Sequence, residues 1–98
     1  MIIVNQKLKN KDADRLFEAI LTLKTVDECC AFFEDLCTIK EIQSMAQRIA
    51  VADMLREKKV YSDIVNATGA STATISRVNR SLVFGSDGYS VAFDRLKK

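Results

Sequence analysis

The chain has 98 residues, with 15 basic and 13 acidic side chains, a net charge of +2 at pH 7, three cysteines and no histidine. An odd cysteine count without histidine argues against a disulfide framework and against a zinc site. Proline is absent and glycine occurs three times, too little turn chemistry for an all-β fold. Hydrophobic residues make up 48% of the chain, more than a short domain buries easily, and a second copy is the simplest cover for the excess.

The charge is unevenly distributed. Residues 1–37 hold 5 basic and 7 acidic side chains, whereas residues 38–98 hold 10 and 6. We therefore expect any polyanion-binding surface in the C-terminal two-thirds of the chain. The first residues are too short for the apolar region of a signal peptide, and no apolar run approaches a membrane span. We expect a single domain over residues 1–98, cytoplasmic, without a cofactor or metal.

The N-terminal third predicts two helices behind a basic arm. The arm carries Lys7, Lys9 and Lys11, and a solvated, disordered tail is the expected state. Asp12 is the candidate cap of the first helix, and Thr25 with Glu28 forms a capping box for the second. Apolar residues follow helical spacing along both helices, at Leu16, Phe17, Ile20, Leu21 and Leu23 in the first and at Cys30, Phe32, Phe33, Leu36 and Cys37 in the second.

Thr38 and Glu41 repeat the capping-box pattern and begin the longest predicted helix, which runs to about Lys58. Its apolar stripe comprises Ile42, Met45, Ala46, Ile49, Ala52 and Leu55. A band this broad on three consecutive helices indicates contacts on more than one side, as when helices of two subunits interleave. A last amphipathic helix carries Tyr89, Ala92, Phe93 and Leu96. The cysteines are interpreted as small hydrophobes, with a redox switch as the alternative.

Residues 62–84 read as a helix-turn-helix. A short helix over about 62–68 ends at Gly69, where only glycine takes a left-handed backbone cheaply. Ser71 can cap a second helix over 72–84 by accepting from its free N–H groups. Three apolar residues of that helix, at i, i+3 and i+7, face inward to meet Ile64, namely Ile75, Val78 and Leu82.

The outward face of the second helix is small and hydroxylic at its start and basic further along, and residues 68–86 contain no acidic side chain. Short side chains let a helix N-terminus enter the major groove, and hydroxyls and arginines reach base edges and phosphates. The predicted contacts to double-stranded DNA are Ser71, Thr72, Ala73, Thr74, Ser76, Arg77 and Arg80. A plain helical hairpin, or a module that binds RNA or another protein, is the alternative, and an enzyme has little support without an acid–base histidine.

At these residues the chain resembles the Trp repressor superfamily, over roughly Leu36 to Leu82. The most specific part is the run from Gly69 to Arg77, which resembles the family's turn and recognition helix, and Ala46-Gln47-Arg48-Ile49 resembles the arginine-bearing stretch of its central helix. The stretch from Arg77 through Tyr89 is similar to the YerC/YecD group of Gram-positive bacteria. The resemblance implies an all-α, intertwined helical homodimer that regulates transcription, as a repressor.

The resemblance also implies a ligand pocket between the long helix and the recognition helix. Arg48 and Arg77 match the two arginines that flank the indole ring in tryptophan-binding members, and Thr38 matches a pocket-lining residue. Val78 stands where those members have glycine. A small-molecule effector is therefore possible, but we expect that it is not L-tryptophan, because extra carbons in a packed site are costly. The alternative is that Val78 points into the core against Ile64 and leaves the pocket open.

Overall fold

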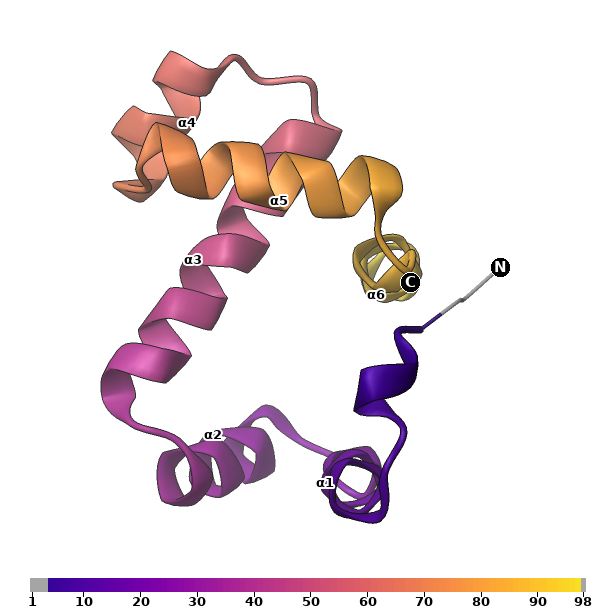
Figure 1. The fold of residues 1–98 in the computed structure, drawn as a ribbon. Helices are drawn as coiled ribbons and strands as arrows, with labels where there is room; N and C mark the ends of the chain where they lie inside the picture. Colours follow the sequence, from indigo (N-terminus) through magenta and orange to yellow (C-terminus); the bar gives the residue numbers. More distant parts are fainter. Residues whose placement is uncertain (1–3, 98) are drawn as a thin grey trace. The chain divides into compact units, whose positions relative to one another are not determined.

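The computed structural model describes residues 4–97, which form only helices (Figure 1), so the all-α prediction is confirmed. In chain order they are the 3-10 helix η1 (Gln6–Leu8) and the α-helices α1 (Lys11–Leu21), α2 (Val26–Leu36), α3 (Ile39–Arg56), α4 (Tyr61–Thr68), α5 (Thr72–Phe84) and α6 (Gly88–Leu96). The helices group into two compact units, residues 4–42 and 43–97, with the boundary inside α3. The single domain over residues 1–98 stays a prediction. No helix in the described range is long and apolar enough to cross a membrane.

Local capping explains where the helices of residues 4–42 begin. Asn10, not Asp12, caps α1: its backbone is extended and its side chain accepts from the Ala13 amide at 2.8 Å. The predicted cap was therefore wrong by two residues. Asp12 instead lies in the first turn, where its negative charge interacts favourably with the positive end of the helix dipole. The basic arm is also more ordered than predicted, because Lys7 lies in η1 and Lys11 begins α1.

The capping box of Thr38 and Glu41 is confirmed, whereas only the Thr25 half of the other box forms, because the Glu28 carboxylate accepts from the Lys24 amide at 2.9 Å instead of the Thr25 amide. The Glu28 amide donates to Thr25 Oγ1 at 3.0 Å, and the Glu41 amide donates to Thr38 Oγ1 at 3.1 Å. The Thr38 amide donates in return to Glu41 Oε1 at 2.8 Å. Hydrogen bonding of the Glu41 carboxyl to Thr38, first to its backbone and then to its side chain, lowers the pKa of this carboxyl below its ordinary value.

The helix α3 ends two residues earlier than predicted. Lys58 has a left-handed backbone with φ 65°, and its amide donates to the Leu55 carbonyl while the Lys59 amide donates to Met54. This hydrogen-bond pattern closes a helix C-terminus in the way that a glycine usually does. A lysine in this position ends α3 at Arg56, and α4 then starts at Tyr61 behind Val60.

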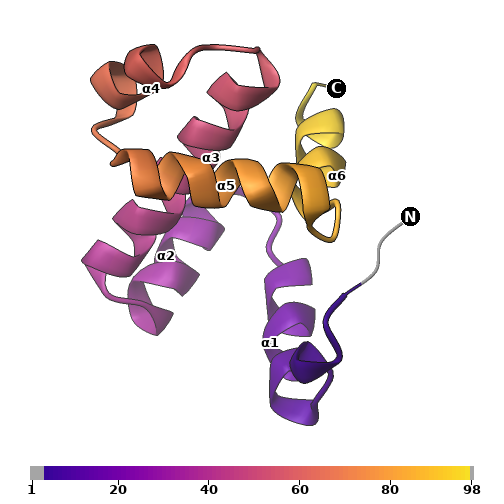
Figure 2. The same cartoon turned by 45° about the horizontal axis from the view of Figure 1, so that its top comes forward.

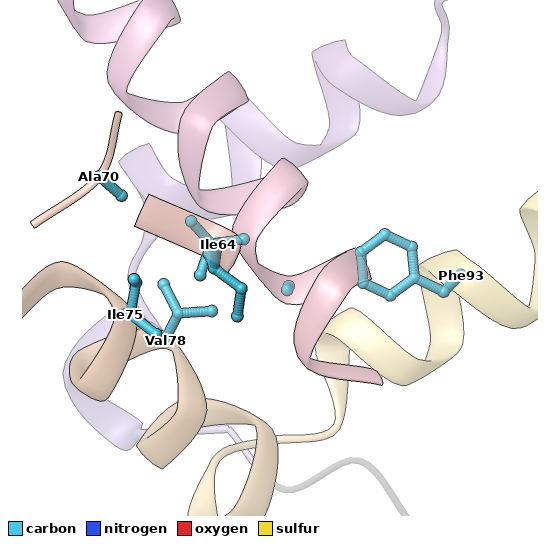
Figure 3. Packing of buried hydrophobic residues seen from close by; sticks show 7 residues of the cluster. Ile64, Ala70, Ile75, Val78 and Phe93 are labelled. Atoms are coloured by element: carbon cyan, nitrogen blue, oxygen red, sulfur yellow. The ribbon is translucent and has the colours of Figure 1, made fainter. Parts of the chain in front are cut away.

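The hydrophobic core of the described chain lies in residues 43–97. Two positions of α3 contribute to it together with α4, the turn, α5 and α6 (Figure 3), and its buried members are Val51, Ala52, Ile64, Ala70, Ile75, Val78 and Phe93. The helix α5 passes across α3 in both orientations of the molecule (Figures 1 and 2). Arg56 at the end of α3 holds α6: its guanidinium lies 5.3 Å from the centre of the Phe93 ring and 3.1 Å from Asp94 Oδ1.

The residues of the predicted apolar stripes are not the same as the residues that are buried within the single chain. On α3, Ala52 is buried but Val51 takes the second core position, while Met45 and Ile49 remain 37% and 43% exposed. On α2, Cys30 is exposed and Cys29 is half-buried instead. Among residues 4–42 no side chain is buried, and Leu21 is 83% exposed. The sequence periodicity therefore marks apolar faces that one chain alone does not cover.

Candidate nucleic-acid interface

The turn between α4 and α5 has the geometry that the sequence predicts. Gly69 is left-handed at φ 73°, and its amide donates to the Val65 carbonyl. Thr68 braces the same turn: its hydroxyl donates to the Ile64 carbonyl at 2.7 Å and accepts from the Ala70 amide at 3.1 Å. Since Ala70 is 2% exposed, the turn is part of the core, and the chain leaves it in a defined direction toward α5.

Ser71 begins the second helix of the motif, as predicted. Its side chain accepts from the Thr74 amide at 3.1 Å, and its hydroxyl also donates to Thr74 Oγ1 at 3.1 Å. Helix α5 then runs from Thr72 to Phe84, the bounds expected from the sequence. Ile75 and Val78 are buried and Leu82 packs against the same cluster, so the inward face of α5 is fixed against Ile64 (Figure 3).

The predicted DNA contacts lie on the opposite, solvent-facing side of α5. Thr74 is half-buried, and the other six residues are exposed, namely Ser71, Thr72, Ala73, Ser76, Arg77 and Arg80. No acidic residue lies on α5, and neither Arg77 nor Arg80 has a recorded ion pair within residues 4–97. The exposed face therefore offers hydroxyls, a small methyl group and two unpaired guanidinium groups. Such a face can approach a groove and neutralise phosphates.

The residues predicted to line an effector pocket lie on different elements of the chain. Thr38 belongs to residues 4–42, where its hydroxyl serves the cap of α3. Arg48 is half-buried on α3 and donates to Ser44 Oγ at 3.2 Å, whereas Arg77 is exposed on α5. Val78 is 3% exposed inside the core (Figure 3). Of the two orientations considered for Val78, the structure has the one that faces Ile64.

Two features of this interface were missed in the sequence. Gln47 on α3 donates from Nε2 to the Thr68 carbonyl at 3.1 Å. A side-chain bond to a backbone carbonyl 21 residues away leaves no periodic signal. Phe84 at the end of α5 is 82% exposed and lines a shallow groove together with Arg77 and Arg80. The spacing of 77, 80 and 84 on one helix face could have indicated this second feature.

Two helices joined by a left-handed glycine turn, with a buried inner face and with an acid-free outer face on the second helix, define the helix-turn-helix class of regulators. The sequence profile of the family described as Trp repressor protein matches residues 11–97. The chain belongs to this family. It is a family of DNA-binding regulators, not of enzymes.

The relatives extend over nearly the whole chain. The uncharacterized protein YerC of Bacillus subtilis is 59% identical over 92 residues, which are 94% of this chain and 88% of that protein. The crystal structure of a TrpR-like protein from Eubacterium eligens is 60% identical with a TM-score of 0.92, covering 95% of this chain and 96% of the other. A candidate Trp repressor from Staphylococcus aureus is 51% identical with a TM-score of 0.90, covering 94% and 92%. The expected relation to the YerC-type branch is thereby confirmed.

Proposed function

We propose that this protein is a homodimeric, cytoplasmic transcriptional repressor that recognises specific double-stranded DNA sequences through α5. The exposed, acid-free face of α5, held by a buried inner face, carries the proposal. Most of the affinity would come from phosphate contacts, which carry no sequence information, and the specificity from contacts to base edges.

The position of each exposed residue along α5 indicates whether it would contact base edges or phosphates. Thr72, Ala73 and Ser76 are short and exposed near the N-terminal end of the helix, where side chains of recognition helices reach base edges in the major groove. Arg77 and Arg80 lie further along α5, where their longer side chains would reach phosphates. Ser71 and Thr74 are committed to the cap, so the free N–H groups of the first turn are ordered and available to a phosphate.

The uncovered apolar faces support a homodimer. Residues 4–42 bury no side chain, and Phe17, Leu21 and Leu36 are 46%, 83% and 52% exposed. A soluble monomer rarely keeps so much apolar surface in water. A second copy of the chain offers matching surfaces and also places two recognition helices for a palindromic site. Sedimentation showing a folded monomer at micromolar concentration would contradict this part of the proposal.

The decisive experiment is selection of bound sites from random duplexes with the purified protein. We expect enrichment of a palindromic sequence, and absence of any enriched duplex would refute specific recognition. Arg80→Ala should weaken binding to all duplexes. It should also make the slope of log affinity against log salt concentration shallower by about 1.8, which is about 0.9 for each of the two Arg80 side chains in the dimer. Ser76→Ala should instead change the preferred sequence. Arg95→Ala, an exposed arginine on α6 outside the proposed interface, is the matched control and should leave both properties unchanged.

A small-molecule effector is a separate part of the proposal. Arg48 and Arg77 stay its candidate ligands by resemblance, and we keep the proposal that L-tryptophan is not the effector. The proposal rests on the departure at Val78 from the glycine of the tryptophan-binding members. The Val78 side chain is buried against Ile64, so its volume does not itself obstruct the pocket, and calorimetry with L-tryptophan tests the proposal.

A further inference from the structure

The contact between α3 and the turn of the helix-turn-helix has two different parts. Val51 and Ala52 of α3 pack into the core beside Ile64, and apolar packing of this kind has little directional preference. Gln47, one turn earlier, donates from Nε2 to the Thr68 carbonyl at 3.1 Å in a partly buried position. A hydrogen bond depends strongly on distance and angle, so this contact restrains rotation of α3 against the motif in a way that the apolar contacts do not.

The carbonyl that accepts this bond is at a sensitive place. Thr68 is the last residue of α4, and the last four carbonyls of a helix have no partner within the helix. The Thr68 hydroxyl accepts from the Ala70 amide, and Ala70 directly precedes Ser71, the cap of α5. A continuous series of contacts therefore runs from Gln47 through Thr68 and Ala70 to the start of the recognition helix.

We infer that Gln47 is a positioning residue for DNA recognition, which fixes the orientation of α5 by holding the Thr68 carbonyl. The inference rests on the proposed DNA-binding function. Without the bond, the motif keeps its core but α5 gains rotational freedom relative to α3. Base contacts require accurate placement of short side chains, whereas phosphate contacts through long arginines tolerate small rotations. Loss of Gln47 should therefore reduce specific binding more than non-specific binding.

The test compares Gln47→Met, which keeps the shape and removes the donor, with Gln47→Glu, which offers only acceptors to a carbonyl at neutral pH. Gln43→Met is the matched control, because Gln43 is exposed one turn earlier on α3. Each variant is titrated with the selected duplex and with a scrambled duplex, and its thermal midpoint is measured. We expect Gln47→Met to lose about three- to tenfold in affinity for the selected duplex, Gln47→Glu at least as much, and neither to change affinity for the scrambled duplex.

Amide exchange gives a second readout that does not depend on DNA. Exchange at Ala70 should accelerate in both Gln47 variants and stay at the parental rate in Gln43→Met. An unchanged ratio of specific to non-specific affinity, in variants of a parent that does discriminate, would overturn the inference, as would a fall in both affinities that follows the thermal midpoint. If the parent itself shows no preference among duplexes, the proposed DNA-binding function fails first, and the positioning role fails with it.

Discussion

Gly69→Ala isolates the energetic cost of the helix-turn-helix turn. Gly69 has φ 73°, and a Cβ built on it meets no atom within 4 Å. The substitution therefore introduces no steric clash and changes only the backbone energy, by about 1–2 kcal/mol for an L-residue in the left-handed region. For a domain of this size 1 kcal/mol corresponds to a fall of about 4–8 °C in Tm. Gly69→Asn should cost less, since asparagine tolerates this conformation better.

The matched control is Gly88→Ala. A Cβ on Gly88 also meets nothing within 4 Å, but its φ is not in the left-handed region, and it is the first residue of α6. Alanine there should leave Tm unchanged or raise it slightly. Thermal unfolding is followed by far-UV circular dichroism at several protein concentrations, because self-association shifts Tm by mass action. If Gly69→Ala melts like the parent, or if Asn and Ala cost the same, the turn does not have the proposed conformation.

Three further predictions concern the core, the capping box and the effector. Ile64→Ala removes a fully buried side chain and should lower the free energy of unfolding in urea by about 2–5 kcal/mol; a loss below 1 kcal/mol would contradict the core. Hydrogen bonds to Thr38 lower the pKa of the Glu41 carboxyl below its ordinary value. The ionised carboxyl therefore adds to the free energy of unfolding above the ordinary pKa of glutamate, and this addition is lost as the pH falls through the lowered pKa. In Glu41→Gln the acid-dependent part should disappear, and an unchanged pH profile would show that the carboxylate is not involved. Calorimetry should detect no L-tryptophan binding, and a Kd below about 1 mM that is lost in Arg48→Ala would show that the effector is tryptophan after all.

The part of the fold that the sequence predicted best is the part governed by local rules. Gly69 ends α4, Ser71 caps α5, and α5 runs from Thr72 to Phe84 as expected. Each of these features depends on a residue's own backbone preference or on a partner three residues away. The cap of α1 was misplaced because Asn10 and Asp12 are both acceptable caps, and only the extended backbone of Asn10 distinguishes them.

Features that depend on distant contacts were not predictable in the same way. Lys58, two residues after the end of α3, has a left-handed conformation that lysine does not prefer. Nothing in the neighbouring sequence indicates this conformation. The Gln47 bond to Thr68 joins residues 21 positions apart. The orientation of Val78 was left open in the sequence, because the spacing of Ile75, Val78 and Leu82 predicted burial while the family resemblance suggested a pocket.

The mismatch between predicted stripes and observed burial has one common physical origin. Periodicity marks every face that is apolar, whichever molecule covers it, whereas burial in one chain reports only contacts within that chain. Ala52 belongs to the buried cluster within one chain, so both signals agree there, whereas Val51 is buried in the same cluster although it lies outside the predicted stripe. Ile49 and Met45 lie on α3 beyond that contact and stay partly in water. If the second copy supplies the missing cover, as proposed, the sequence stripes describe the dimer, and substituting Ile49 by a polar residue should weaken self-association while the core around Ile64 stays folded.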